Sequence, residues 1–153
     1  MNNRKRQKIK HMRGAKLSKL QIWNLRQTLA AYIAGGLRQF MNREIYGFPS
    51  DLEKDDDVDP DGSIAMNEWR NILKEMLWSF DQIARNEYPP TMKWYGEQYK
   101  TLEEQGISAT DICLNPSILP DLPINIYEAD MRHSDRLQHG IDLFAKYFFD
   151  LWD

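Results

Sequence analysis

The stretch MNEWRNILKEMLWSFDQIARN, residues 66–86, decides the fold. Its large apolar side chains recur every three or four residues, which places them on one face of an α-helix. They are Trp69, Ile72, Leu73, Met76, Leu77, Phe80, Ile83 and Ala84. The Pro89-Pro90 pair ends the pattern, because proline lacks the backbone N–H that a helix interior needs. The sequence therefore predicts an amphipathic helix over about 66–86.

An earlier helix is predicted to begin at Ser18. Ser18 and Gln21 have the spacing of a capping box, in which each side chain accepts the other residue's backbone N–H. The apolar residues that follow advance by three or four positions: Ile22, Leu25, Leu29, Ile33, Leu37 and Phe40. Gly35-Gly36 interrupts them, and each glycine costs about 1 kcal/mol relative to alanine in a helix. We expect a kink or a closely packed backbone there, and a helix end at Gly47-Phe48-Pro49.

The remaining chain predicts two further helices separated by an irregular segment. The first spans about 91–105 and ends at Gly106, a residue type favoured after a helix C-terminus. Residues 107–125 contain three prolines and are expected to lie across the bundle. The last helix is expected over about 127–151, with an inner stripe of Leu137, Ile141, Phe144, Phe148 and Leu151.

Together these patterns predict an all-α fold. It is a bundle of four main helices with a long Pro-containing connection before the last one. A basic flexible arm at 1–16 precedes a single helical domain at 17–153, which includes an acidic loop at 50–65. A chain of 153 residues with 42% hydrophobic residues fits one domain with a core of its own.

Composition also narrows where the protein is expected. No apolar run approaches the roughly 18–20 residues that span a bilayer, and no apolar signal stretch follows the basic N-terminus. Cys113 is the only cysteine, so an intrachain disulfide is impossible. We expect an intracellular protein, or one carried in an intracellular particle, without a membrane partner.

The net charge of −3 hides a strong asymmetry along the chain. Residues 1–20 carry eight basic side chains and no acid: Arg4, Lys5, Arg6, Lys8, Lys10, Arg13, Lys16 and Lys19. The remainder has 12 basic against 23 acidic residues, a balance of −11. The arm contains no aromatic residue for base stacking, so nucleic-acid contact would involve only the phosphate backbone. The alternatives are an acidic protein, a sister subunit, or a solvated tail.

The acidic loop contains the sharpest local motif. Residues 57–68 fit the calcium-binding EF-hand template, with candidate ligands at Asp57, Asp59, Asp61, Ser63 and Glu68. Gly62 stands where that loop turns sharply. However, the residues before the loop do not read as an apolar entering helix, and no second loop pairs with it. The alternative is an acidic solvated loop that favours the N-terminus of the next helix, with no cofactor.

Other reactive or aromatic residues predict no catalytic site. His133 and His139 lie six residues apart on one helix and do not share a face, and Cys113 is expected to be a small packed residue. Trp23 and Trp69 are expected in the core, whereas Trp78 and Trp94 fall partly off their stripes: they are core residues, line a pocket or sit in an interface.

The C-terminal turns are apolar on more than one side. They are expected to lie in the centre of the bundle or to contact another subunit through Tyr147, Phe149 and Trp152.

Several segments together resemble a family. These are WNL at 23–25, GFP at 47–49, EWRNILKEM at 68–76 and LFAKYFFDLWD at 143–153. They are similar to a group of small uncharacterised tailed-bacteriophage proteins, and the likeness extends over about half of the chain. The resemblance implies a phage origin rather than a mechanism, and with it a place in the host cytoplasm or in the virion. The acidic loop falls where that group has a short turn, which favours an insertion over an EF-hand.

These observations lead to a ranked expectation of function. The first is a non-enzymatic phage accessory protein that binds a host or phage protein, for example an inhibitor of a host defence protein. The second is a virion or assembly component that touches DNA or shell proteins through its basic arm. The third is an oligomeric sponge for a nucleotide signal.

Overall fold

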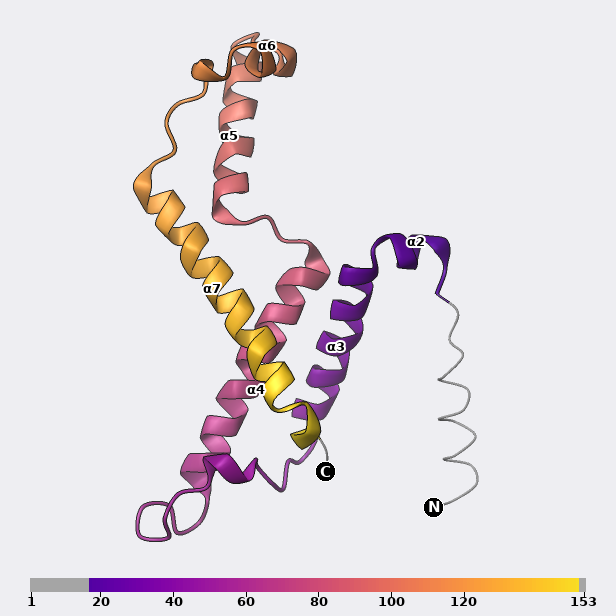
Figure 1. The fold of residues 1–153 in the computed structure, drawn as a ribbon, viewed down its shortest axis with the longest axis vertical. Coiled ribbons are helices and arrows are strands. Elements are labelled where there is room, and N and C mark those ends of the chain that lie inside the picture. Colours follow the sequence, from indigo (N-terminus) through magenta and orange to yellow (C-terminus); the bar gives the residue numbers. More distant parts are fainter. Residues whose placement is uncertain (1–16, 152–153) are drawn as a thin grey trace.

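The computed structural model describes residues 17–151 (Figure 1). Its helices are α2 (Lys19–Trp23), α3 (Leu25–Met41), α4 (Ser63–Arg85), α5 (Pro90–Glu104), α6 (Ala109–Leu114) and α7 (Ile124–Lys146). Three short 3₁₀ turns join them: η1 (Ser50–Leu52), η2 (Pro116–Ile118) and η3 (Phe148–Asp150). These residues contain no β-strand, which confirms the predicted all-α class.

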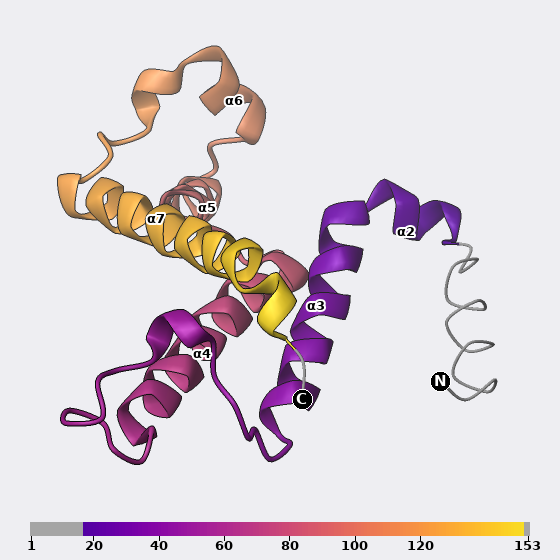
Figure 2. The same cartoon turned by 60° about the horizontal axis from the view of Figure 1, so that its bottom comes forward.

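The core forms around α4, which packs between α3 and α7 (Figures 1 and 2). Trp69, Leu73 and Met76 of α4 are fully buried, as their spacing along the helix predicts. Aromatic rings from α7 and the residue after it complete this core. Phe80 meets Phe144 at 4.9 Å, and Trp69 meets Tyr147 at 5.4 Å, both edge to face. The burial of these side chains agrees with the amphipathic helix that the sequence predicts over about 66–86.

The two long helices α4 and α7 cross at Gly140. This glycine is buried, and a Cβ atom added to it would lie 2.1 Å from the Ser79 hydroxyl oxygen and 2.6 Å from the Glu75 carbonyl oxygen. Ser79 is itself fully buried and donates a hydrogen bond to the carbonyl of Arg136 at 3.3 Å. Small residues on both helices thus allow an unusually close approach of the two backbones.

Helix α5 and the first half of α7 extend away from this core, with α6 at their far end (Figure 1). Helix α5 contains no buried residue and packs mainly along α7. The expectation that residues 107–125 lie across the bundle is wrong. They form α6 and η2 at the tip, because a capping box between Ser108 and Asp111 starts a short helix there.

The N-terminal helix also differs from its prediction. It breaks at Asn24 into α2 and α3 and ends at Met41 rather than near Gly47. The capping box of Ser18 is present, with bonds of 2.8 and 3.2 Å. Gly35 and Gly36 cause no break, and no atom lies within 4 Å of a Cβ built on either one.

Trp23 corrects a second expectation, since it is not a core residue. Its side chain is 87% exposed. Helix α2 projects from the end of α3, away from α4 and α7 (Figure 2).

Candidate functional site

The acidic loop prepares the start of α4. Both carboxylate oxygens of the buried Asp59 accept backbone N–H groups, from Ile64 at 3.0 Å and from Ala65 at 2.9 Å. Asp61 accepts the N–H of Ser63 at 3.1 Å, and hydrogen bonds from Ser63 hold the pKa of Asp61 below its usual range. These bonds satisfy N–H groups that a helix N-terminus otherwise leaves open.

The predicted calcium ligands do not converge in this arrangement. Asp57 and Ser63 are exposed, and Glu68 forms an ion pair with Lys54 at 2.9 Å. Within residues 17–151, no group of three or more His, Cys, Asp or Glu side chains is placed to hold a metal ion. The geometry fits the alternative reading, a loop that supports the helix N-terminus, and calcium binding stays a prediction.

The predicted nucleic-acid or acidic-partner residues belong to the N-terminal arm. Arg4, Lys5, Arg6, Lys8, Lys10 and Arg13 all lie outside the described residues. Trp152, predicted as an interface residue, lies outside them as well.

Of the other two predicted interface residues, Tyr147 is part of the core. It is 3% exposed, and its hydroxyl donates to Asp51 at 3.1 Å while accepting from Lys146 at 2.7 Å. Lys146 also pairs directly with Asp51 at 2.7 Å, which lowers the pKa of Asp51 and raises that of Lys146. Tyr147 therefore ties the end of α7 to η1 rather than facing a partner. Phe149, in contrast, is 86% exposed.

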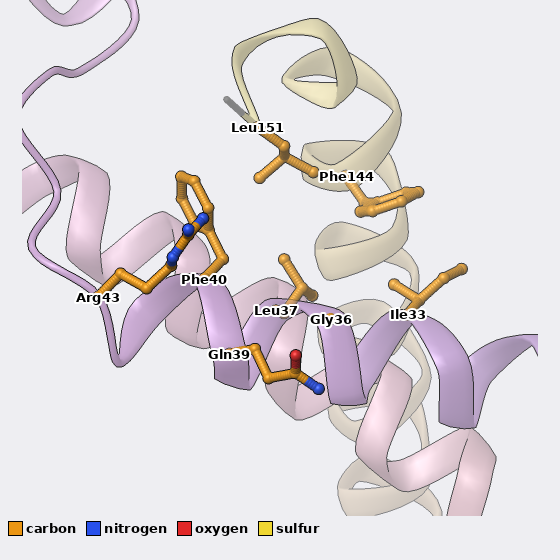
Figure 3. Close-up of a pocket in the computed structure, with 8 residues that line it drawn as sticks. All are labelled: Ile33, Gly36, Leu37, Gln39, Phe40, Arg43, Phe144 and Leu151. Carbon is orange, nitrogen blue, oxygen red and sulfur yellow. The ribbon is translucent and has the colours of Figure 1, made fainter. Parts of the chain in front are cut away.

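A groove of about 610 Å³ runs between α3 and the end of α7 (Figure 3). Its wall is largely apolar and its lining residues are Ile33, Gly36, Leu37, Gln39, Phe40, Arg43, Phe144 and Leu151. Figure 3 shows Ile33 and Leu37 pointing toward the α7 side of the groove, while Gln39 points away from it. Sequence periodicity could not identify this groove, because it depends on the space left between two helices.

Next to the groove, α2 and the first half of α3 expose six large apolar side chains. We call this surface the α2–α3 face: Leu20, Ile22, Trp23, Leu25, Leu29 and Tyr32, exposed by 41–87%. A hydrogen bond from the Thr28 hydroxyl to the Gln21 carbonyl at 3.2 Å links α2 to α3. The α2–α3 face carries basic residues at Lys19 and Arg26 and no acidic ones.

A polar cluster joins α4 and α7 beside their crossing. Arg136 makes two bonds to the Glu75 carboxylate, at 2.9 and 3.0 Å, and its guanidinium lies 4.0 Å from the Trp78 ring centre. The ion pair lowers the pKa of Glu75 and raises that of Arg136. His133 contacts the same indole edge to face at 5.5 Å. Trp78 thus packs between α4 and α7, one of the alternatives that the sequence left open for it.

A strongly acidic region extends away from the core. Residues 87–135, which we call the projection, comprise α5, α6, η2 and the first half of α7. They contain nine acidic residues and three basic ones. Exposed apolar side chains lie among these charges, including Met92, Tyr99, Leu114, Tyr127 and Met131.

The chain was compared with protein families, curated proteins and solved structures. No family model, curated protein or solved structure matches the chain. The resemblance to the bacteriophage group stays a prediction from the quoted motifs. None of the helices in residues 17–151 has the length and apolarity to cross a membrane.

Proposed function

We propose that this protein is a non-enzymatic, phage-encoded accessory protein that binds a host protein and blocks it. The observation that carries the proposal is the projection, an acidic and partly apolar two-helix extension held away from the core (Figure 1). The target that fits it is a protein with a basic groove, such as a nucleic-acid-binding host defence protein. The carboxylates of the projection would compete with nucleic-acid phosphates for that groove.

The dimensions of the projection suit such a role. Helix α5 has 15 residues, which corresponds to about 22 Å of helix, and it packs along α7 on one side only. Its outward carboxylates include Glu97, Glu103 and Glu104, all exposed. Charges on such a surface attract a basic partner over about one Debye length, roughly 8–10 Å at physiological salt. Exposed tyrosine and methionine side chains among them supply apolar contact area.

The experiment uses the full chain as bait in lysate of the host, with two charge variants. The first changes Glu97, Glu103 and Glu104 to glutamine in the projection. The matched control changes Glu53 to glutamine and Asp56 and Asp57 to asparagine, which removes the same charge from the acidic loop. We expect capture of a basic protein that weakens with salt and is lost only in the projection variant.

Two results would contradict the proposal. One is that no protein is captured and deletion of the gene leaves phage growth unchanged on defended hosts. The other is detection of the protein as a constituent of purified particles by mass spectrometry, which would favour a virion component.

A second candidate function has an observation of its own. A cavity of about 610 Å³ lies where α3, α4 and α7 meet, a volume typical of small-molecule sites. Its polar lining comprises Arg26, Tyr88 and His133, several amide side chains and the Glu87 carboxylate. Tyr88 can stack on a base and Arg26 can hold a phosphate. This supports the nucleotide-sponge alternative. A thermal-shift screen with nucleotides tests it, and stabilisation that persists in an Arg26→Ala, His133→Ala variant would exclude this cavity.

A further inference from the structure

We propose that the α2–α3 face is a dimer interface, and that a second copy of this chain covers it through an antiparallel pairing of the two α3 helices. This inference is independent of the proposed function, because it concerns residues of α2 and α3, none of which belongs to the projection.

The first argument is the size of the exposed apolar area. With about 200 Å² for each fully exposed large apolar residue, the six side chains of the α2–α3 face leave roughly 750 Å² accessible. The largest apolar patch on a typical monomer is about 300–600 Å². A standard protein interface buries about 800 Å² on each partner. The three residues on α3 supply roughly 320 Å² of this area and the three on α2 supply the rest, so the pairing of the two α3 helices reaches the area of a standard interface only when α2 also contacts the second copy.

The second argument is that this surface complements itself. A two-fold interface uses the same patch on both copies, so the patch has to contain both a ridge and a hollow. Leu25, Leu29 and Tyr32 form the ridge, since they follow one another by four and three residues on a single side of α3. The same stripe continues to Gly36, which borders the groove between α3 and α7. An antiparallel pair would bring the ridge of each copy to the groove of the other.

The third argument comes from Gly36 itself. Glycine in a helix interior costs about 1 kcal/mol relative to alanine, and α3 contains two in succession. Nothing in the described fold lies within 4 Å of a Cβ at either position, so packing within one chain does not require them. In an antiparallel pair centred near Ala34, Gly36 lies opposite Tyr32 of the second copy. The missing side chain then leaves space for the tyrosine ring.

Charge does not oppose this pairing. Arg38, which lies beside the stripe, is already paired with Asp81 of α4 within the same chain. Arg26 bonds Asn86, at the end of α4, across 3.5 Å. Asp81 neutralises Arg38, whereas the amide of Asn86 leaves the charge of Arg26 in place. In a pair centred near Ala34, Arg26 lies opposite Asn42 of the second copy, so the Arg26 and Arg38 side chains of the two copies do not face each other.

The test is the oligomeric state of the full chain, measured by sedimentation velocity over a wide concentration range. We expect a monomer–dimer equilibrium for the wild type. Leu29→Asp with Tyr32→Asp should raise the dimer Kd by roughly a hundredfold, because buried interface anchors commonly contribute tenfold or more each. Gly36→Leu should weaken the dimer as well, although its side chain points into open space in one chain.

The matched control is Tyr127→Asp with Met131→Asp, which places the same charges on similarly exposed apolar residues of the projection. Circular dichroism should show unchanged helix content in every variant, because each altered residue lies on the surface. The control should dimerise like the wild type.

Three outcomes would overturn the inference. They are a wild type that is monomeric at all concentrations, a dimer lost in the control but not in the α3 variants, and a monomer that binds vesicles of anionic lipid through the α2–α3 face.

Discussion

Replacing Gly140 with alanine tests the close crossing of α4 and α7. The added methyl group would overlap the Ser79 hydroxyl at 2.1 Å and the Glu75 carbonyl at 2.6 Å. The hydroxyl can rotate, but the carbonyl belongs to the backbone of α4, so the two helices have to separate. Overpacking of this kind costs about 1–3 kcal/mol, and more where the backbone has to move. Alanine returns about 1 kcal/mol of helix propensity. We expect a net loss of about 2 kcal/mol.

Thermal unfolding followed by circular dichroism measures this effect. For a chain of this size, about 2 kcal/mol corresponds to a fall in Tm of roughly 4–8 °C. The control is Gly96→Ala in α5, where no atom lies within 4 Å of the new methyl group, and it should raise Tm by a few degrees. In a Ser79→Gly background the loss caused by Gly140→Ala should shrink by about 1 kcal/mol. A rise in Tm for Gly140→Ala like that of the control would refute the close crossing.

Three other predictions concern the start of α4 and its polar contact with α7. Asp59→Ala should lower the free energy of unfolding by about 1–2 kcal/mol in urea titrations, because one buried and one partly buried backbone N–H group lose their acceptor. Asp57→Ala should change it by less than about 0.5 kcal/mol. Millimolar calcium should leave the melting temperature of the wild type unchanged if the loop only caps the helix; a rise that Asp57→Ala abolishes would establish an EF-hand. Glu75→Gln should cost about 0.5–1 kcal/mol at pH 7, an ion-pair value reduced for solvent screening. Since the pKa of Glu75 is lowered in the fold, its contribution is present above about pH 4.3 and disappears as the pH falls through the folded pKa, so variant and wild type should converge in acid.

The sequence predicts which residues of α4 form the core, but it does not predict how the helices outside the core are arranged. The stripe on α4 is wide and regular enough that only burial between other helices can satisfy it, and the structure buries Trp69, Leu73 and Met76. The stripe on α3 has the same periodicity, yet Leu25 and Leu29 are exposed. Periodicity shows which residues share a face, but it does not show whether another part of the chain is long enough to reach that face.

The candidate sites could likewise be predicted only in part. The acidic loop was recognised by its residue types, but only backbone geometry shows that Asp59 faces the N–H groups of α4. Tyr147 was expected to face a partner because the end of α7 is apolar on several sides. It is buried because α7 stops at Lys146 and the chain turns, which places the ring against Trp69. Gly140 gave no signal, since a single glycine in a helical pattern has several ordinary explanations.

The same glycine divides α7 unequally, which gives the helix the proportions of a lever with its fulcrum at the crossing. The part from Ile124 to Gly140 is about 24 Å long and belongs largely to the projection, whereas the part from Gly140 to Lys146 is about 9 Å long and ends at the bonds to Asp51. A tilt of α7 about this point would therefore move its free end between two and three times as far as its core end. Force applied at the far tip would be multiplied by the same ratio where the helix meets η1.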